Sequence, residues 1–181
     1  PENQIMGSGT ILDTARLRYG LSEHFQVAQG NIHAYVFGEH GDTSFIPWTG
    51  AYISGLSTDE YYEEMKAHGK DVKPLDKEAM LEYVQKSGGK VIAKKGATFY
   101  AVSATVCQLV GLILAASDSL ATVSSMLHGE YGIEDVCLST LTLVGPNGTQ
   151  GKVQMRMNKE EVALLKKSAD ALKEVIAQIE L

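Results

Sequence analysis

Residues 5–19 read IMGSGTILDTARLRY, a glycine-containing lead-in that runs into a predicted helix over residues 11–25. Ser8 or Thr10 stands where a side chain can cap the first turn of that helix. The stripe expected to face the core carries Leu12, Ala15, Tyr19 and Ser22. The charged side chains that lie off this stripe are Asp13, Arg16 and Arg18.

The segments after this helix predict a mixture of strands and helices. Residues 31–38 are rich in β-branched and aromatic side chains, so they predict a strand that ends in the polar turn 39–42. By the same reasoning, further strands are expected over residues 46–53, 120–127, 136–144 and 151–157. Further helices are expected over residues 60–68, 76–95 and 98–117, the second interrupted on its polar surface by Ser87-Gly88-Gly89.

The C-terminal segment contains the clearest helix. Asn158 is a good N-cap, and Glu161 completes a capping box. Apolar side chains then recur every three or four residues: Val162, Leu165, Ala169, Leu172, Ile176 and Ile179. The order of elements predicts a single α+β domain over residues 1–181, in which antiparallel sheet packs with helices and a long C-terminal helix.

The composition is that of an ordinary globular domain. Hydrophobic residues make up 44% and charged residues 21%, which argues against disorder. The net charge of −6 and the absence of a Lys/Arg-rich block disfavour nucleic acid and anionic membranes as partners. Residues 97–117 carry no charge, but their polar interruptions predict a buried helix rather than a membrane span. Cys107 and Cys137 are expected to be buried free thiols, and residues 1–4 lack a signal-peptide pattern, so we expect an intracellular protein.

The nucleotide-loop and metal signatures are incomplete. Residues 7–12 carry two glycines of a dinucleotide fingerprint but have Leu12 in place of the third. Residues 145–153 depart from a phosphate-binding loop in spacing and at Val153. The five histidines show no i, i+4 pair of the helical zinc type, and neither cysteine has a partner thiol nearby. We therefore predict no metal site.

Three polar residues invite a functional interpretation. His40 follows a predicted strand, where a rigid scaffold can present a catalytic side chain, although position alone favours a structural histidine. Asp13 and Arg16 are three residues apart and therefore share one side of their helix. They could form a surface ion pair, or Asp13 could face an imidazole while Arg16 grips a substrate carboxylate. The spacing does not choose between these alternatives.

These residues also resemble a known family. Residues 5–19, followed by the GEHGD segment 38–42, look like the catalytic half of the L-lactate/malate dehydrogenases. Residues 95–100 (KGATFY) and the helix over residues 158–181 continue the match in the family's order. The resemblance implies the family's C-terminal fold and, within the family, is strongest to the bacterial lactate-converting members.

The resemblance implies a role for each site residue. His40 is expected to donate and accept the proton, with Asp13 holding its ring, while Arg16 binds the substrate carboxylate and Thr98 lines the substrate pocket. Ser8 is expected to approach the nicotinamide of NAD. Arg18 and His33 match positions at which allosteric bacterial members bind fructose 1,6-bisphosphate between subunits.

The resemblance also implies an incomplete enzyme. It covers the catalytic half, so the nucleotide-binding domain is expected to be missing and the fragment alone nearly inactive. The full-length protein is expected to be a cytoplasmic homotetramer that interconverts pyruvate and L-lactate, with malate or another L-2-hydroxy acid as the alternative substrate. Two other classes stay open: a metal-dependent hydrolase that uses His33, Glu39, His40 and Asp42, and a non-catalytic assembly module.

Overall fold

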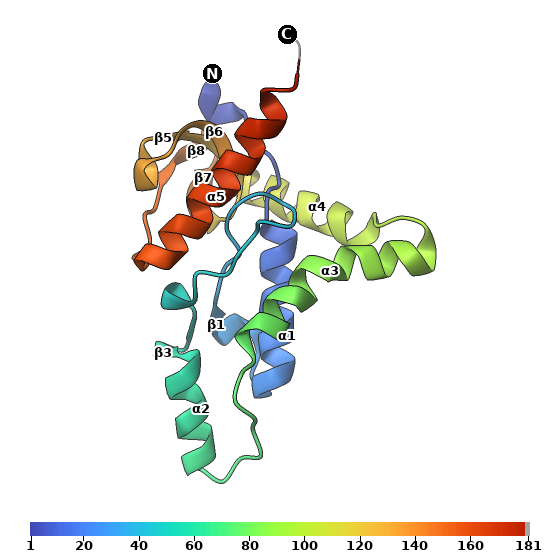
Figure 1. Cartoon of the computed structure of the whole chain (residues 1–181), viewed down its shortest axis with the longest axis vertical. Coiled ribbons are helices and arrows are strands. Elements are labelled where there is room, and N and C mark those ends of the chain that lie inside the picture. Colours follow the sequence, from blue (N-terminus) through green and yellow to red (C-terminus); the bar gives the residue numbers. More distant parts are fainter. Residues whose placement is uncertain (180–181) are drawn as a thin grey trace.

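A computed structural model describes residues 1–179 of the chain and contains five α-helices in that range. They are α1 (Ile11–Phe25), α2 (Thr58–Ala67), α3 (Lys77–Lys95), α4 (Tyr100–Leu114) and α5 (Lys159–Ile176). Helix α1 runs through the middle of the molecule, with α2 toward one end and α5 beside the C-terminal strands at the other (Figure 1). This arrangement confirms the expected α+β class with its C-terminal helix.

The strands form small antiparallel sheets. The first sheet has the order β1-β2-β3, made of Ile32–His33, Tyr52–Ile53 and Leu56–Ser57. The second has the order β4-β7-β8, made of Ser119–Ala121, Thr142–Gly145 and Gly148–Lys152. The third pairs β5 (Ser124–His128) with β6 (Glu134–Ser139). Every pairing is antiparallel, as the sequence predicted.

Several predicted strands are wrong in extent. The expected strands over residues 31–38 and 46–53 shrink to two residues each, since a 3₁₀ turn occupies Trp48–Gly50 and residues 37 and 38 make only isolated bridges. The expected strands over residues 120–127 and 136–144 each divide between two sheets. The expected strand over residues 151–157 begins earlier, at Gly148, and ends at Lys152. The chain therefore changes sheet where a continuous β-pattern suggested one long strand.

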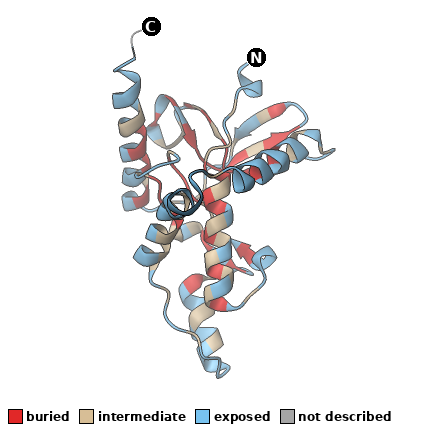
Figure 2. Ribbon diagram, turned by 90° about the vertical axis from the view of Figure 1, so that its right-hand side faces the viewer, coloured by how far each residue is buried: buried red, intermediate tan, exposed pale blue. Residues whose placement is uncertain are grey.

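The core-facing stripe of α1 also differs from the prediction. Leu17, Leu21 and Phe25 are buried and pack in one cluster with β1 and β2, whereas Tyr19 is 48% exposed. Buried residues follow this helix and the strands, with helix surfaces exposed around them (Figure 2). The N-terminal half of α1 buries Asp13, which the sequence placed off the stripe. A carboxylate buried in this way needs partners, because desolvation of a charge is costly.

Helix α4 is not the buried helix that its uncharged sequence predicted. Only Thr105 and Leu109 are buried within it. Four valine and leucine side chains spaced four residues apart form an exposed stripe: Val102, Val106, Val110 and Leu114. The apolar residues are present, but no part of the described chain covers them. The cysteine prediction fails similarly, because Cys107 on α4 and Cys137 on β6 are both exposed.

Side-chain caps mark the first residues of α3 and α5. Asp76 accepts a hydrogen bond from the backbone N–H of Ala79 at the start of α3. Asn158 and Glu161 form the predicted capping box of α5, which ends at Ile176, while Glu180 and Leu181 lie outside the described residues. None of the helices within residues 1–179 combines the length and the apolar character that a membrane crossing requires.

Candidate active site

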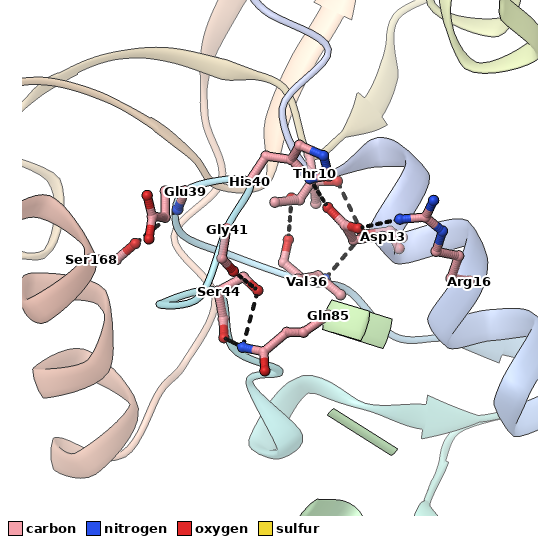
Figure 3. Close-up of polar contacts among 12 residues, drawn as sticks. Thr10, Asp13, Arg16, Val36, Glu39, His40, Gly41, Ser44, Gln85 and Ser168 are labelled. Carbon is pink, nitrogen blue, oxygen red and sulfur yellow. Dashed lines mark hydrogen bonds and ion pairs between the residues drawn. The ribbon is translucent and has the colours of Figure 1, made fainter. Parts of the chain in front are cut away.

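Asp13 binds two side chains at once and forms the centre of the site (Figure 3). His40 Nδ1 lies 2.6 Å from Asp13 Oδ2, and Arg16 Nη1 donates to Asp13 Oδ1 over 3.0 Å. Because a carboxylate only accepts, Nδ1 of His40 carries the proton and Nε2 is left for a ligand. Asp13 is 4% exposed, whereas the His40 side chain is 61% exposed. The arrangement is a buried carboxylate that orients an accessible imidazole.

The start of α1 is hydrogen-bonded to the segment before the His40 loop. Thr10 donates from Oγ1 to the Val36 carbonyl over 2.5 Å, and Thr14 Oγ1 accepts from the Val36 N–H over 3.0 Å. Thr10 occupies the N-cap position, but it makes no capping hydrogen bond, and neither does Ser8. The predicted cap is therefore wrong, because the Thr10 hydroxyl bonds the neighbouring segment instead. These bonds align Asp13 with His40.

Two side chains that the sequence analysis missed hold the loop around His40. Ser168 of α5 accepts from the Glu39 N–H over 2.8 Å, across a sequence separation of 129 residues. Gln85 of α3 donates from Nε2 to the Asp42 and Ser44 carbonyls over 3.1 and 2.9 Å. Ser168 is fully buried, so its contact with Glu39 is shielded from water. No local sequence signal could identify either residue, because each acts only through tertiary contact.

Glu39 has a structural task within the same loop. Its Oε1 accepts from the Thr43 backbone N–H over 3.1 Å and from the Thr43 hydroxyl over 2.6 Å. Within residues 1–179, no group of three or more His, Cys, Asp or Glu side chains is arranged to hold a metal ion. The geometry of the described residues therefore gives no support to the hydrolase alternative built on His33, Glu39, His40 and Asp42.

The Asp13 carboxylate determines the charge of His40. Its hydrogen bond raises the pKa of His40 above the ordinary value near 6.5, partial burial opposes that rise, and the Asp13 charge adds to it. The Arg16 charge lowers the same pKa. The net result is an imidazole that stays protonated to higher pH than a free histidine. Such a group can supply a proton near neutral pH.

This electrostatic coupling predicts a pH effect. A step that needs protonated His40 is fast at low pH and is lost as pH rises through the raised pKa. In full-length Asp13→Asn protein, we expect the alkaline limb of the 2-oxo acid reduction that the sequence resemblance implies to move to lower pH, with kcat/KM about tenfold lower because a charge-assisted hydrogen bond is lost. Steady-state rates across a pH series measure the limb. Asp71→Asn, at an exposed carboxylate outside the described lining of the pocket, is the matched control, and an unmoved limb in Asp13→Asn would contradict the coupling.

A pocket of about 240 Å³ opens beside this triad. Its wall includes Asp13, Arg16, His40 and Thr98, so the structure brings together four of the predicted site residues. Apolar side chains complete one part of the wall: Leu12, Ile92 and Val102. Within residues 1–179, Nη2 and Nε of Arg16 make no hydrogen bond to protein. The guanidinium can therefore hold Asp13 and still present donors to a ligand, so the two alternatives for Arg16 are compatible.

Ser8 lies on another side of His40. A second hollow of about 350 Å³ is lined by Ser8 with its two flanking glycines, and His40 borders this hollow as well as the first pocket. Other residues around it come from the β5 and β6 strands and include Ser124 and Ser139. His40 thus stands between two spaces that different ligands could occupy.

Arg18 and His33 lie away from this pocket. Arg18 donates from Nε to the Ala34 carbonyl over 3.1 Å, and its guanidinium carbon lies 5.0 Å from the centre of the Tyr35 ring. His33 is exposed on β1, next to Ala34 in the chain. The structure therefore brings Arg18 to the strand that carries His33, and it shows no direct contact between the two side chains. This pair forms a separate candidate site.

The fold and the acid–base pocket define a C-terminal domain of the lactate/malate dehydrogenase type. Residues 10–180 match the family model for the lactate/malate dehydrogenase alpha/beta C-terminal domain, and the chain belongs to this family. L-lactate dehydrogenase from Acetivibrio thermocellus is 43% identical over 181 residues, which cover all of this chain and 56% of that protein. L-lactate dehydrogenase 1 from Clostridium acetobutylicum is 42% identical over 99% of this chain and 56% of its own length.

Solved structures agree with this assignment. The L-lactate dehydrogenase from Clostridium thermocellum superposes with a TM-score of 0.89 at 34% identity, and it covers all of this chain and 58% of that chain. The minor L-lactate dehydrogenase from Enterococcus mundtii, solved in a ligands-bound form, gives a TM-score of 0.90 at 29% identity, with 100% and 56% coverage. The predicted family and fold are confirmed. The chain spans a little over half the length of these relatives.

Proposed function

We propose that the full-length protein carrying this chain is an NAD-dependent L-lactate dehydrogenase that interconverts pyruvate and L-lactate. The single observation that carries the proposal is the convergence of Asp13, Arg16 and His40 on one pocket. Relatives with the name L-lactate dehydrogenase support it at 42–43% identity. The chain contributes the substrate-binding and acid–base half of the enzyme and by itself has little or no activity.

The proposed reaction uses each side chain in a defined way. Arg16 binds the substrate carboxylate through the guanidinium donors that Asp13 leaves free. Reduction turns the C2 carbonyl oxygen into an alkoxide, to which His40 gives its Nε2 proton, and oxidation of lactate returns the proton to the same nitrogen. Asp13 stabilises the imidazolium and holds the ring.

The residues near Ser8 fit one end of the cofactor. The hollow shared by Ser8 and His40 has serine side chains on its wall and lies against the group proposed to exchange the proton. Ser8 would approach the nicotinamide there, and when bound the nicotinamide supplies or removes the hydride. The remaining contacts to NAD require the part of the protein that this chain does not supply.

The pocket lining favours pyruvate over oxaloacetate, which carries a second carboxylate. Among the described residues that line it, Arg16 is the permanent cation, and the walls near Thr98 are apolar or small. A second substrate carboxylate, as in oxaloacetate or malate, would need a cationic partner of its own. The methyl group of pyruvate needs none.

The corresponding experiment compares two substrates. We expect the full-length enzyme to reduce pyruvate with a kcat/KM at least about tenfold above that for oxaloacetate, since an unpaired buried charge is costly. Rates of NADH oxidation with each substrate measure the ratio. A preference for oxaloacetate would favour malate dehydrogenase, and failure to reduce either would favour another 2-hydroxy acid or the assembly-module alternative.

Self-association is part of the proposal. The exposed stripe of α4 is apolar over its whole length, with Val102 at one end and Leu114, 79% exposed, at the other. Surfaces of this kind are stabilised when another chain covers them. The full-length protein is therefore proposed to be a homo-oligomer. The resemblance to the family implies that the oligomer is a tetramer and that the protein works in the cytoplasm.

The Arg18 and His33 pair is proposed as an effector site for fructose 1,6-bisphosphate. Arg18 uses Nε for the Ala34 carbonyl, which leaves its terminal nitrogens for a phosphate, and exposed His33 can add a charge. Two such pairs across a two-fold axis would bind one bisphosphate and favour the assembled state.

Activation can be measured at low pyruvate. We expect fructose 1,6-bisphosphate to raise the rate of the full-length enzyme several-fold. In Arg18→Gln, the effector concentration that gives half-maximal activation should rise about tenfold, because an Arg–phosphate hydrogen bond is lost. The assay is repeated at several protein concentrations, since assembly responds to mass action. Undiminished activation of Arg18→Gln would refute the site.

A further inference from the structure

Lys152, the last residue of β8, carries an amine that contacts only hydroxyl and carbonyl oxygens among residues 1–179. Its Nζ donates to Oγ of Ser125 on β5, to the Ser125 carbonyl over 3.4 Å and to Oγ1 of Thr142 on β7 over 3.2 Å. Ser125 and Thr142 are buried, and Lys152 is partly buried. The amine therefore links the sheet that contains β7 and β8 to the pair β5 and β6.

A cavity of about 180 Å³ opens beside this amine. Its wall includes Ser125, Thr142 and Lys152, and it also includes Glu2 and His128. The side chains of Glu2 and His128 are exposed, so the cavity connects with the surface. A small reagent can therefore reach the amine from solvent.

No carboxylate among residues 1–179 forms an ion pair with Lys152. The two glutamates on the cavity wall contact His128 instead: Glu2 Oε1 lies 2.5 Å from Nε2 of the ring, and Glu130 Oε2 accepts from the backbone N–H over 2.6 Å. Burial without a paired charge disfavours an ammonium group, so the pKa of Lys152 lies below its ordinary value near 10.5. The charges of Glu130 and Cys137 oppose this change without cancelling it. Lys152 therefore has a larger share of free amine near neutral pH than a solvated lysine has.

The two hydroxyl groups suit an uncharged amine. Thr142 donates its own hydroxyl hydrogen to the Thr140 carbonyl over 3.0 Å, so it can only accept from Lys152. The Ser125 hydroxyl has no other hydrogen-bond partner among residues 1–179, so its hydrogen is left for the lone pair of an uncharged Lys152 amine. The free amine is thus accommodated without leaving either hydroxyl unpaired.

We propose that Lys152 is a site of covalent acylation, at which its amine takes a small acyl group from an acyl phosphate. The Nζ lone pair forms a bond to the acyl carbon, and the bond between that carbon and the phosphate oxygen breaks. Inorganic phosphate leaves with the electron pair of the broken bond and takes up the proton that the amine loses. The product is a neutral amide, which removes the unpaired charge and keeps one N–H for the neighbouring oxygens. This inference is independent of the proposed function.

The experiment treats the full-length protein with acetyl phosphate over a pH series and follows each lysine by peptide mass spectrometry. Lys70 and Lys73 are exposed and form no ion pair among residues 1–179, so they serve as internal controls. Near neutral pH, we expect Lys152 to be acetylated about tenfold faster than either control, because each unit by which the pKa falls gives about tenfold more free amine. This advantage should shrink as pH rises, because solvated ammonium groups go on losing protons to higher pH.

A parallel reaction in concentrated urea separates the effect of the site from that of the local sequence. In the unfolded protein the three lysines should react at similar rates, because the cavity and its hydroxyl groups are no longer assembled around Lys152. If Lys152 in the folded protein reacts no faster than Lys70 and Lys73, the acylation site is wrong. An advantage that persists in urea would also overturn the proposal, because neighbours in the sequence would then cause it.

Discussion

Replacing His40 by asparagine in the full-length enzyme should lower kcat for pyruvate reduction by about 10³-fold, within the range of 10² to 10⁴ usual for a general acid. Asparagine keeps a polar side chain of similar reach but cannot supply a proton to the alkoxide. The loss should be in kcat, while NADH binding, measured by fluorescence titration, stays near that of the wild type.

A matched control separates the chemistry from the fold. His68 lies at the end of α2, is exposed and contacts the Glu64 carbonyl through Nδ1. His68→Asn should leave kcat and the midpoint of thermal unfolding near the wild-type values. His40→Asn should lower the midpoint by only a few degrees, because buried Asp13 loses its bond to the imidazole but keeps its bond to Arg16. Near-normal turnover in folded His40→Asn would show that another group transfers the proton.

Replacing Arg16 by lysine should raise the KM for pyruvate by about 10- to 100-fold. Charge-assisted hydrogen bonds contribute about 1.5–3 kcal/mol, and lysine replaces the planar donor fork with one ammonium group. Asp13 would compete for that single group, because it already binds the guanidinium at 3.0 Å. The dissociation constant for NADH should change much less, since Arg16 is not placed near the Ser8 side of His40.

Arg156→Lys provides the matched control for this change. Arg156 is exposed beyond β8 and outside the described lining of the pocket. Its substitution should leave the pyruvate KM unchanged. If Arg16→Lys also kept the wild-type KM, the substrate carboxylate would have to bind elsewhere, and the pocket would need a different orientation for its ligand.

Local sequence determined the helices that carry the site. Asp76 and the pair Asn158 and Glu161 predicted the starts of α3 and α5 correctly, because a cap bonds backbone groups within its own first turn. The family motifs also predicted the site residues, and Asp13, Arg16, His40 and Thr98 do line one pocket. The cap predictions depend only on residues a few positions apart. The site predictions depend on whole segments that resemble the family's motifs.

Strand boundaries and burial depended on contacts that a linear pattern does not contain. Residues 120–127 and 136–144 have the composition of long strands, yet each crosses from one sheet to another. Helix α4 has the composition of a buried helix but lies on the surface, since burial depends on whether other residues cover it. For these segments, the sequence indicated their apolar character correctly, but the predicted strand extents and the predicted burial of α4 were wrong.

The support of His40 was decided by tertiary structure alone. Ser168 contacts Glu39 from 129 residues away, and Gln85 reaches the Asp42 and Ser44 carbonyls from α3. A serine or glutamine within a helix has no local pattern that distinguishes such a contact from solvent exposure. The sequence by itself therefore predicted which side chains meet at the pocket. Only the packing of α1, α3 and α5 around the loop decided how they are held, because hydrogen bonds between distant segments form only after the chain has folded.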